Sequence, residues 1–113
     1  MKEIKAYIKP HKLSAITLAL HDVKGLTGMS VVDVRGFGRG RGKDAPSRIV
    51  DELVDYVPHV KIEIVCLDEQ VIEIVSLIEQ TAHTGLRGDG KIYVSGIEEA
   101  VRIQTGERGE EAV

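Results

Sequence analysis

The string Thr84-Gly-Leu-Arg-Gly-Asp-Gly-Lys91 combines three glycines with two basic side chains, Arg87 and Lys91. Glycine lets the backbone turn tightly and approach a ligand closely, and backbone N–H groups beside cations suit a phosphate. Residues 85–91 fit the first seven positions of a Walker A loop, but the eighth is Ile92, which has no hydroxyl for Mg²⁺. The string therefore predicts a phosphate-binding loop that is not a P-loop. The alternative is a glycine-rich turn without a ligand.

Four strand patterns and two helix patterns surround this loop. Apolar and polar residues alternate over 1–9 and 60–66, and Val-rich or aromatic segments cover 29–35 and 91–95. Apolar residues at three- and four-residue steps predict one helix from Pro10 to Lys24-Gly25 and another that begins at Asp68. The expected apolar faces of the two helices are Leu13, Ile16, Leu20 and Val23, and then Val71, Ile74, Val75, Ile78 and Ala82.

The order β-α-β-β-α-β predicts an α+β, ferredoxin-like sandwich: a four-stranded antiparallel sheet with two helices on one face. The other face would carry polar and apolar side chains together, namely Glu3, Lys5, Tyr7, Lys61, Glu63, Val65 and Tyr93. A face so mixed favours coverage by another subunit and hence a homo-oligomer. A glycine-rich string begins at Gly36, which is expected to break the second strand, and is followed by a short helix or a long loop. Residues 97–113 are expected to form an edge segment or a frayed end.

The composition excludes several function classes. The 113 residues are enough for one domain, with 42% hydrophobic and 29% charged residues. One Phe, three Tyr and a net charge of −3 argue against nucleic-acid and anionic-membrane binding. No apolar run approaches the ~20 residues of a membrane span, and no signal peptide is recognisable, so a cytoplasmic protein is expected. The single Cys66 is expected to be buried and inert, and the four histidines have no metal-site spacing.

Five strings spread along the chain resemble the P-II nitrogen-regulatory signal-transduction family. They are Ile8-Lys-Pro-His-Lys-Leu13, Val34-Arg-Gly-Phe-Gly-Arg39, Val60-Lys-Ile-Glu-Ile64, the loop from Thr84 to Ile92, and Arg102-Ile-Gln-Thr-Gly-Glu107. The resemblance implies one P-II-like domain over 1–113 and a compact homotrimer. It also implies ATP or ADP in the clefts between subunits, with Mg²⁺ possible beside ATP. Residues 36–55 then correspond to the family's T-loop, 84–91 to its B-loop and 102–108 to its C-loop.

The resemblance also implies roles for single residues. Gly88 to Lys91 would cradle the phosphates, Arg39 would approach them, and Arg102 would come from the adjacent subunit. The implied nucleotide contacts are Tyr7, Gly28, Ser30, Gly36, Arg39, Glu63, Val65, Thr84, Gly88, Asp89, Gly90, Lys91, Arg102 and Gln104. The T-loop would bind a target protein, a membrane transporter or a metabolic enzyme, through Arg41, Lys43, Arg48 and Glu52.

Three positions depart from the family pattern and remove polar or charged groups near the γ-phosphate and the 2-oxoglutarate site. Gly40 replaces a Gln, His59 replaces a Lys, and Gln104 replaces an Arg. We therefore expect weakened or absent 2-oxoglutarate sensing, and the lower charge favours ADP. Glu52 and Val50 stand where other members are uridylylated on Tyr or phosphorylated on Ser, so neither modification is possible at those positions.

Two other interpretations fit parts of the sequence. Arg35-Gly-Phe-Gly38 matches the opening of an RNA-binding RNP1 motif, but it ends the wrong strand and lacks stacking aromatics. An enzyme acting on a phosphorylated small molecule could use the 84–91 loop and would lose its turnover in Lys91→Ala. No base or nucleophile can be paired with Asp89 from the sequence, which predicts that Asp89 shapes the loop as an Asx residue. A non-enzymatic regulator is the favoured prediction.

Overall fold

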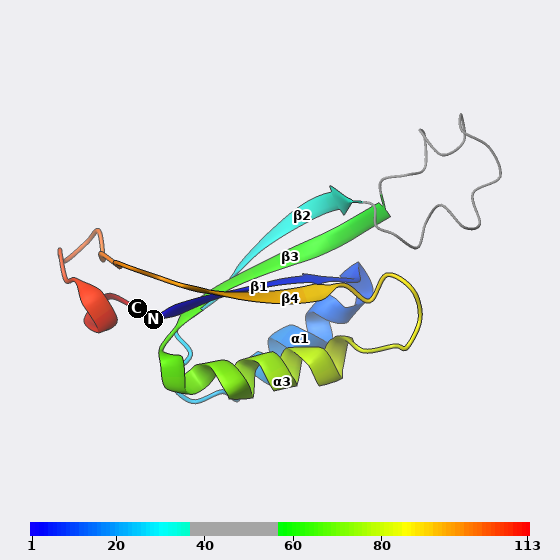
Figure 1. Cartoon of the computed structure of the whole chain (residues 1–113), viewed down its shortest axis with the longest axis horizontal. Coiled ribbons are helices and arrows are strands. Elements are labelled where there is room, and N and C mark those ends of the chain that lie inside the picture. The colour runs from blue at the N-terminus through cyan, green and yellow to red at the C-terminus, as the bar shows by residue number, and fades with distance from the viewer. Residues whose placement is uncertain (37–56) are drawn as a thin grey trace.

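A four-stranded antiparallel sheet organises the parts of the chain that the computed structural model describes, residues 1–36 and 57–113. Its strands are β1 (Lys2–Ile8), β2 (Ser30–Gly36), β3 (Val57–Cys66) and β4 (Lys91–Gly96), in the order β2-β3-β1-β4. The helices α1 (Leu13–Leu20) and α3 (Val71–Ala82) lie on one face of this sheet (Figure 1). The predicted α+β ferredoxin-like fold is confirmed.

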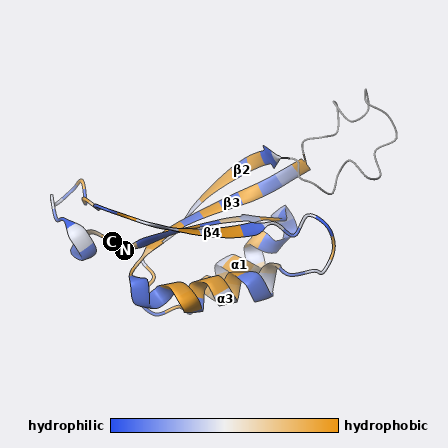
Figure 2. Cartoon of the chain, in the orientation of Figure 1, coloured by the Kyte–Doolittle hydropathy of each residue, from blue (hydrophilic) through white to orange (hydrophobic). Residues whose placement is uncertain are grey.

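The core lies between the sheet and the two helices. The alternating residues of β1 and β3 bury one side of each strand, and the three- and four-residue spacing of α1 and α3 buries one face of each helix. Figure 2 shows hydrophobic stretches in both layers. The fully buried large side chains are Ile4, Ile8, Ile16, Leu20, Ile62, Ile64, Ile74, Ile78 and Cys66.

The sheet face opposite the helices carries the mixed set of side chains that the sequence predicts. The register places Glu3 opposite Val65, and Lys5 between Glu63 and Tyr93. Tyr7 lies beside Lys61 in the same way, and its ring meets that of Tyr93 edge to face at a centroid distance of 6.1 Å. Half of Tyr93 is exposed, so this face retains apolar surface.

Several boundaries differ from the predictions; β3, for example, begins at Val57 and not at Val60. The first helix ends at Leu20, and Val23 is buried from the following turn instead of from a helix. The second strand ends at Gly36, the glycine at which the sequence predicts its end, and Gly36 still pairs with Val57. Residues 97–113 are not a frayed end: Val101 bridges to Arg108, and a 3-10 turn covers Gly109–Ala112.

Two further 3-10 turns precede the helices, at Pro10–Lys12 before α1 and Asp68–Gln70 before α3. Both chain ends lie at one end of the sheet, and the loop between α3 and β4 lies at the other (Figure 1). The predicted short helix or loop after Gly36 lies outside the described residues.

Candidate functional site

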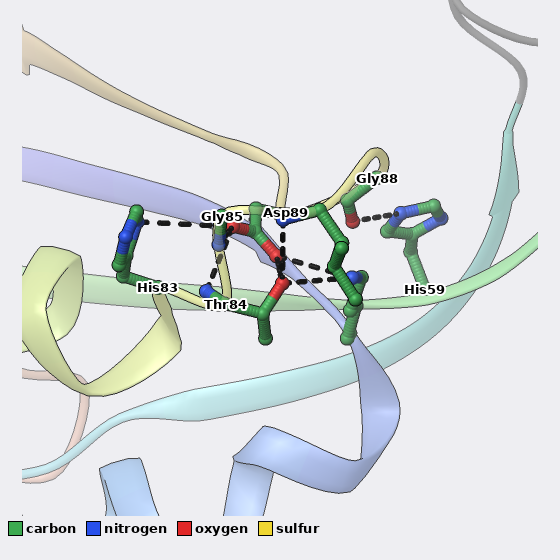
Figure 3. Close-up of polar contacts among 8 residues, drawn as sticks. His59, His83, Thr84, Gly85, Gly88 and Asp89 are labelled. Carbon is green, nitrogen blue, oxygen red and sulfur yellow. Dashed lines mark hydrogen bonds and ion pairs between the residues drawn. The ribbon is translucent and has the colours of Figure 1, made fainter.

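The loop of residues 84–91, which joins α3 to β4, is closed internally by the carboxylate of Asp89 (Figure 3). Asp89 Oδ2 accepts hydrogen bonds from the backbone N–H groups of Thr84, at 2.8 Å, and Gly85, at 2.9 Å. Asp89 Oδ1 accepts from the Thr84 hydroxyl and from the ammonium of Lys9. These bonds, first that of the Thr84 hydroxyl, hold the pKa of Asp89 far below its usual range. They confirm that Asp89 shapes the loop.

Sequence reasoning missed the contribution of Lys9, which follows the end of β1. Its Nζ lies 3.1 Å from Asp89 Oδ1 and 3.1 Å from Thr84 Oγ1. The Thr84 hydroxyl also accepts the N–H of Leu86 at 3.1 Å. One signal for Lys9 was available: the predicted topology places β1 beside β4, so a cation at the end of β1 must lie close to the loop that enters β4.

The glycines of this loop allow it to approach β1 closely. Gly90 has a φ of +101°, and a Cβ built on it would lie 1.6 Å from the carbonyl oxygen of Tyr7. Gly85 and Gly88 also have positive φ angles, which other residues rarely adopt. The sequence therefore has glycine where the backbone requires it.

His59, near the start of β3, contacts the same loop. Its Nε2 lies 3.2 Å from the carbonyl oxygen of Gly88, and its Nδ1 lies 3.2 Å from the carbonyl oxygen of Val57. The imidazole therefore links the start of β3 to the 84–91 loop (Figure 3).

Eight of the predicted nucleotide contacts line two separate recesses. One recess, of about 370 Å³, lies beside the loop and has Tyr7, Asp89, Gly90 and Lys91 in its wall together with apolar residues of α3. The other, of about 600 Å³, is lined by residues of β2, β3 and the C-terminal segment. The predicted residues in this second recess are Gly28, Ser30, Glu63 and Val65.

Within the second recess, Glu63 forms an ion pair with Lys61 at 2.9 Å. The hydrogen bond and the charge of Lys61 lower the pKa of Glu63, and Glu63 raises that of Lys61. A carboxylate that stays ionised in a partly apolar recess can accept hydrogen bonds from a polar ligand.

Arg102 and Gln104 lie away from the loop of their own chain. β4 runs from the loop toward the other end of the sheet, and residues 97–113 continue beyond that end (Figure 1). Arg102 Nη1 pairs with Glu107 at 3.2 Å, and its Nη2 donates to the carbonyl oxygen of Glu111 at 3.2 Å. Gly36 is the last residue of β2 and lies at the end of the sheet where the 84–91 loop enters β4. The predicted residues Arg39, Arg41, Lys43, Arg48 and Glu52 lie outside the described residues.

The structure offers no reactive thiol and no metal cluster among the described residues. Cys66 is buried as predicted, and burial raises the pKa of its thiol, so it does not resemble a reactive cysteine. In the two described ranges, no cluster of three His, Cys, Asp or Glu side chains is placed to hold a metal ion. Neither α1, α3 nor any shorter helix within these ranges has the length and apolarity that crossing a bilayer requires.

Comparison with known proteins identifies the family. The model of the family described as nitrogen regulatory protein P-II matches residues 1–107. Three curated relatives with that name, from Pasteurella multocida, Rhodospirillum rubrum and Azospirillum brasilense, are 50%, 49% and 48% identical over 113 residues, with both chains fully covered. Their name is that of regulatory proteins, which agrees with the predicted absence of enzymatic activity. The chain therefore belongs to the nitrogen regulatory protein P-II family, and it is a signalling regulator rather than an enzyme.

Proposed function

We propose that this protein binds ATP or ADP in clefts between the subunits of a homotrimer and thereby regulates a target protein. The observation that carries the proposal is the geometry of the 84–91 loop. Asp89 orders the loop, and Lys91 is exposed beside it. Within the described ranges, no protein acceptor takes the N–H groups of Gly88 and Gly90. Ordered N–H groups next to a cation favour an anion such as a polyphosphate.

The second recess supports an adenosine site. Its volume of about 600 Å³ is within the usual range for small-molecule sites, and it combines Val65 with the carboxylate of Glu63. On one chain this recess and the 84–91 loop are separate, and Arg102 lies beyond the far end of the sheet. A cyclic trimer would bring such separate parts together from neighbouring chains. Arg102 would then exchange Glu107 for the phosphates of the nucleotide.

The target would be a membrane transporter or a metabolic enzyme of the cytoplasm, bound through the T-loop, residues 36–55. The proposed contacts are Arg41, Lys43, Arg48 and Glu52. Deletion of residues 41–53 should abolish target binding and leave the trimer intact. Light scattering of the deletion variant would show a monomer if these residues instead held the trimer together.

Sensing of 2-oxoglutarate would be weak or absent. Gly40 and Gln104 provide no charge for a dicarboxylate, and both ring nitrogens of His59 already face backbone carbonyl oxygens. This ring would have to leave Gly88 and Val57 before it could contact a carboxylate.

Isothermal calorimetry tests the proposal. ATP, ADP and AMP would each be titrated with and without Mg²⁺ and 2-oxoglutarate. We expect ATP and ADP to bind, no tightening by 2-oxoglutarate, and an affinity loss of about tenfold to a hundredfold in Lys91→Ala, the range for a charge-assisted hydrogen bond. Equal affinity of Lys91→Ala and the native protein would contradict the assignment of the loop. Tighter MgATP binding in the presence of 2-oxoglutarate would contradict the loss of sensing.

A further inference from the structure

The ammonium group of Lys9 contacts two side chains of the 84–91 loop. Its side chain is only 19% exposed, and its Nζ lies 3.1 Å from Asp89 Oδ1 and 3.1 Å from the hydroxyl oxygen of Thr84. Thr84 and Asp89 are also the residues whose hydrogen bonds with each other and with Gly85 hold the loop together (Figure 3). The positive charge of Lys9 is therefore used to neutralise a loop carboxylate.

Tyr7, at the end of β1, and Lys9, just after it, lie next to three consecutive positions of the loop. The Cε of Lys9 lies 3.7 Å from the place where a Cβ of Gly88 would stand, and the Lys9 ammonium pairs with Asp89. The carbonyl oxygen of Tyr7 faces Gly90 so closely that no side chain fits between them. Gly88, Asp89 and Gly90 thus pack against residues 7–9.

We infer that Lys9 is a positioning residue for the 84–91 loop: through Asp89 and Thr84 it fixes the backbone that presents its N–H groups to phosphate. The identity of the ligand rests on the proposed function, whereas the fixing of the loop does not. Lys9 acts through Asp89 and makes no contact with the ligand. Loss of Lys9 would leave the carboxylate of Asp89 with three hydrogen bonds and with His83, whose Nδ1 lies 3.9 Å from Oδ2 and is a cation only when the ring is protonated.

Lys91 offers a matched comparison, because it is a second lysine and the last residue of the same loop. It is exposed, and no ion pair with it is found among the described residues. Substitution of either lysine by Met removes one charge and keeps an unbranched side chain. Only Lys9→Met should loosen the loop, whereas both substitutions should weaken phosphate binding.

Hydrogen exchange of the nucleotide-free protein tests the positioning role directly. The amides of Thr84 and Gly85 donate to Asp89, so their exchange rates report how firmly the carboxylate is held. In Lys9→Met we expect these amides to exchange about tenfold faster or more. The rates should stay native in Lys91→Met and recover partly in Lys9→Arg. Lys9→Gln gives the same comparison if Lys9→Met does not fold. Native rates in the Lys9 variants would overturn the inference.

Calorimetry with inorganic tripolyphosphate then separates this inference from the proposed function. Loss of affinity together with faster exchange in Lys9→Met supports both. Loss of affinity with native exchange would make Lys9 a ligand contact and overturn its positioning role. If the native protein binds neither tripolyphosphate nor ATP, the proposed function fails, and the exchange rates still decide what Lys9 does.

Discussion

Gly90 is the residue at which the loop and β1 come closest. Its φ of +101° is unfavourable for any side chain, and a Cβ at this position would also overlap the carbonyl oxygen of Tyr7. Gly106 has a similar φ of +76°, but nothing lies within 4 Å of its Cβ position. The two glycines therefore separate the cost of the backbone conformation from the cost of the close approach.

We predict that Gly90→Ala lowers the free energy of unfolding clearly more than Gly106→Ala does. Backbone strain alone costs about 1–3 kcal/mol, and only Gly90→Ala adds a displacement of the loop from β1. Urea unfolding would be compared at equal protein concentration, because association of subunits contributes to stability. Equal losses in the two variants would mean that the contact with Tyr7 does not constrain the loop.

Asp89 gives the loop a dependence on pH. Its pKa is lowered in the folded state, mainly by the hydrogen bonds of Thr84, so the ionised carboxylate stabilises the fold at neutral pH. This contribution is fully present above the ordinary carboxyl pKa, about 4. It decreases as the pH falls from there toward the much lower pKa of the folded state.

We therefore predict that the free energy of unfolding falls less steeply with decreasing pH in Asp89→Asn than in the native protein, between about pH 5 and pH 3. Other carboxylates with lowered pKa values, such as Asp68, affect both proteins alike and cancel in the difference. Asp22→Asn is a control, because the Asp22 side chain makes no hydrogen bond within the described part of the chain. Parallel pH curves for native protein and Asp89→Asn would exclude this role.

The helix α3 shows how one element divides its residues between core and solvent. Ile74 is fully buried, whereas Ile72, two residues earlier in the same helix, is 82% exposed. We predict a loss of about 2–5 kcal/mol in the free energy of unfolding for Ile74→Ala, because a cavity remains in the core. Ile72→Ala should change stability by about 0.5 kcal/mol or less. Urea unfolding of both variants would check this, and a large loss in Ile72→Ala would indicate that this side chain is covered in the assembled protein.

At this scale the sequence predicts the centres of the elements better than their ends. The alternation of Ile62, Ile64 and Cys66 depends only on neighbouring residues, and the core of β3 follows from it. Val23 continues the spacing of α1, yet the helix ends at Leu20, because a turn buries Val23 equally well. Contacts between distant segments, which no local pattern contains, also occur here: Gln70 donates to the carbonyl oxygen of Lys24 beside that turn.

In the candidate site, too, the features that depend on neighbouring residues are predictable from the sequence, and those that depend on distant contacts are not. The glycines and Asp89 of the loop are recognisable from a string of eight residues, since their role is local. Lys9 is 75 residues from Thr84 along the chain, and no short pattern contains their contact. The contacts of His59 with Gly88 likewise depend on how β3 lies beside the loop.

For the whole molecule, the arrangement of Arg102 and the 84–91 loop at opposite ends of the sheet has a testable consequence. If each nucleotide site combines the loop of one chain with Arg102 of the next, Arg102→Ala and Lys91→Ala damage two different chains of the same site. A trimer assembled from both variant chains would contain one interface at which an intact loop meets an intact Arg102. That interface should bind nucleotide with native affinity.

We predict that mixed trimers, refolded together and purified through two different affinity tags, recover one tight nucleotide site, whereas each variant alone has none. Calorimetry of the mixed trimers would give the number of tight sites, and mixtures of each variant with itself would serve as controls. If Arg102 instead acts on the loop of its own chain, every loop or its cation is damaged in every mixed trimer, and no tight site returns. The experiment thus distinguishes a site shared between chains from one within a chain, because only a shared site can be repaired by combining two defective chains.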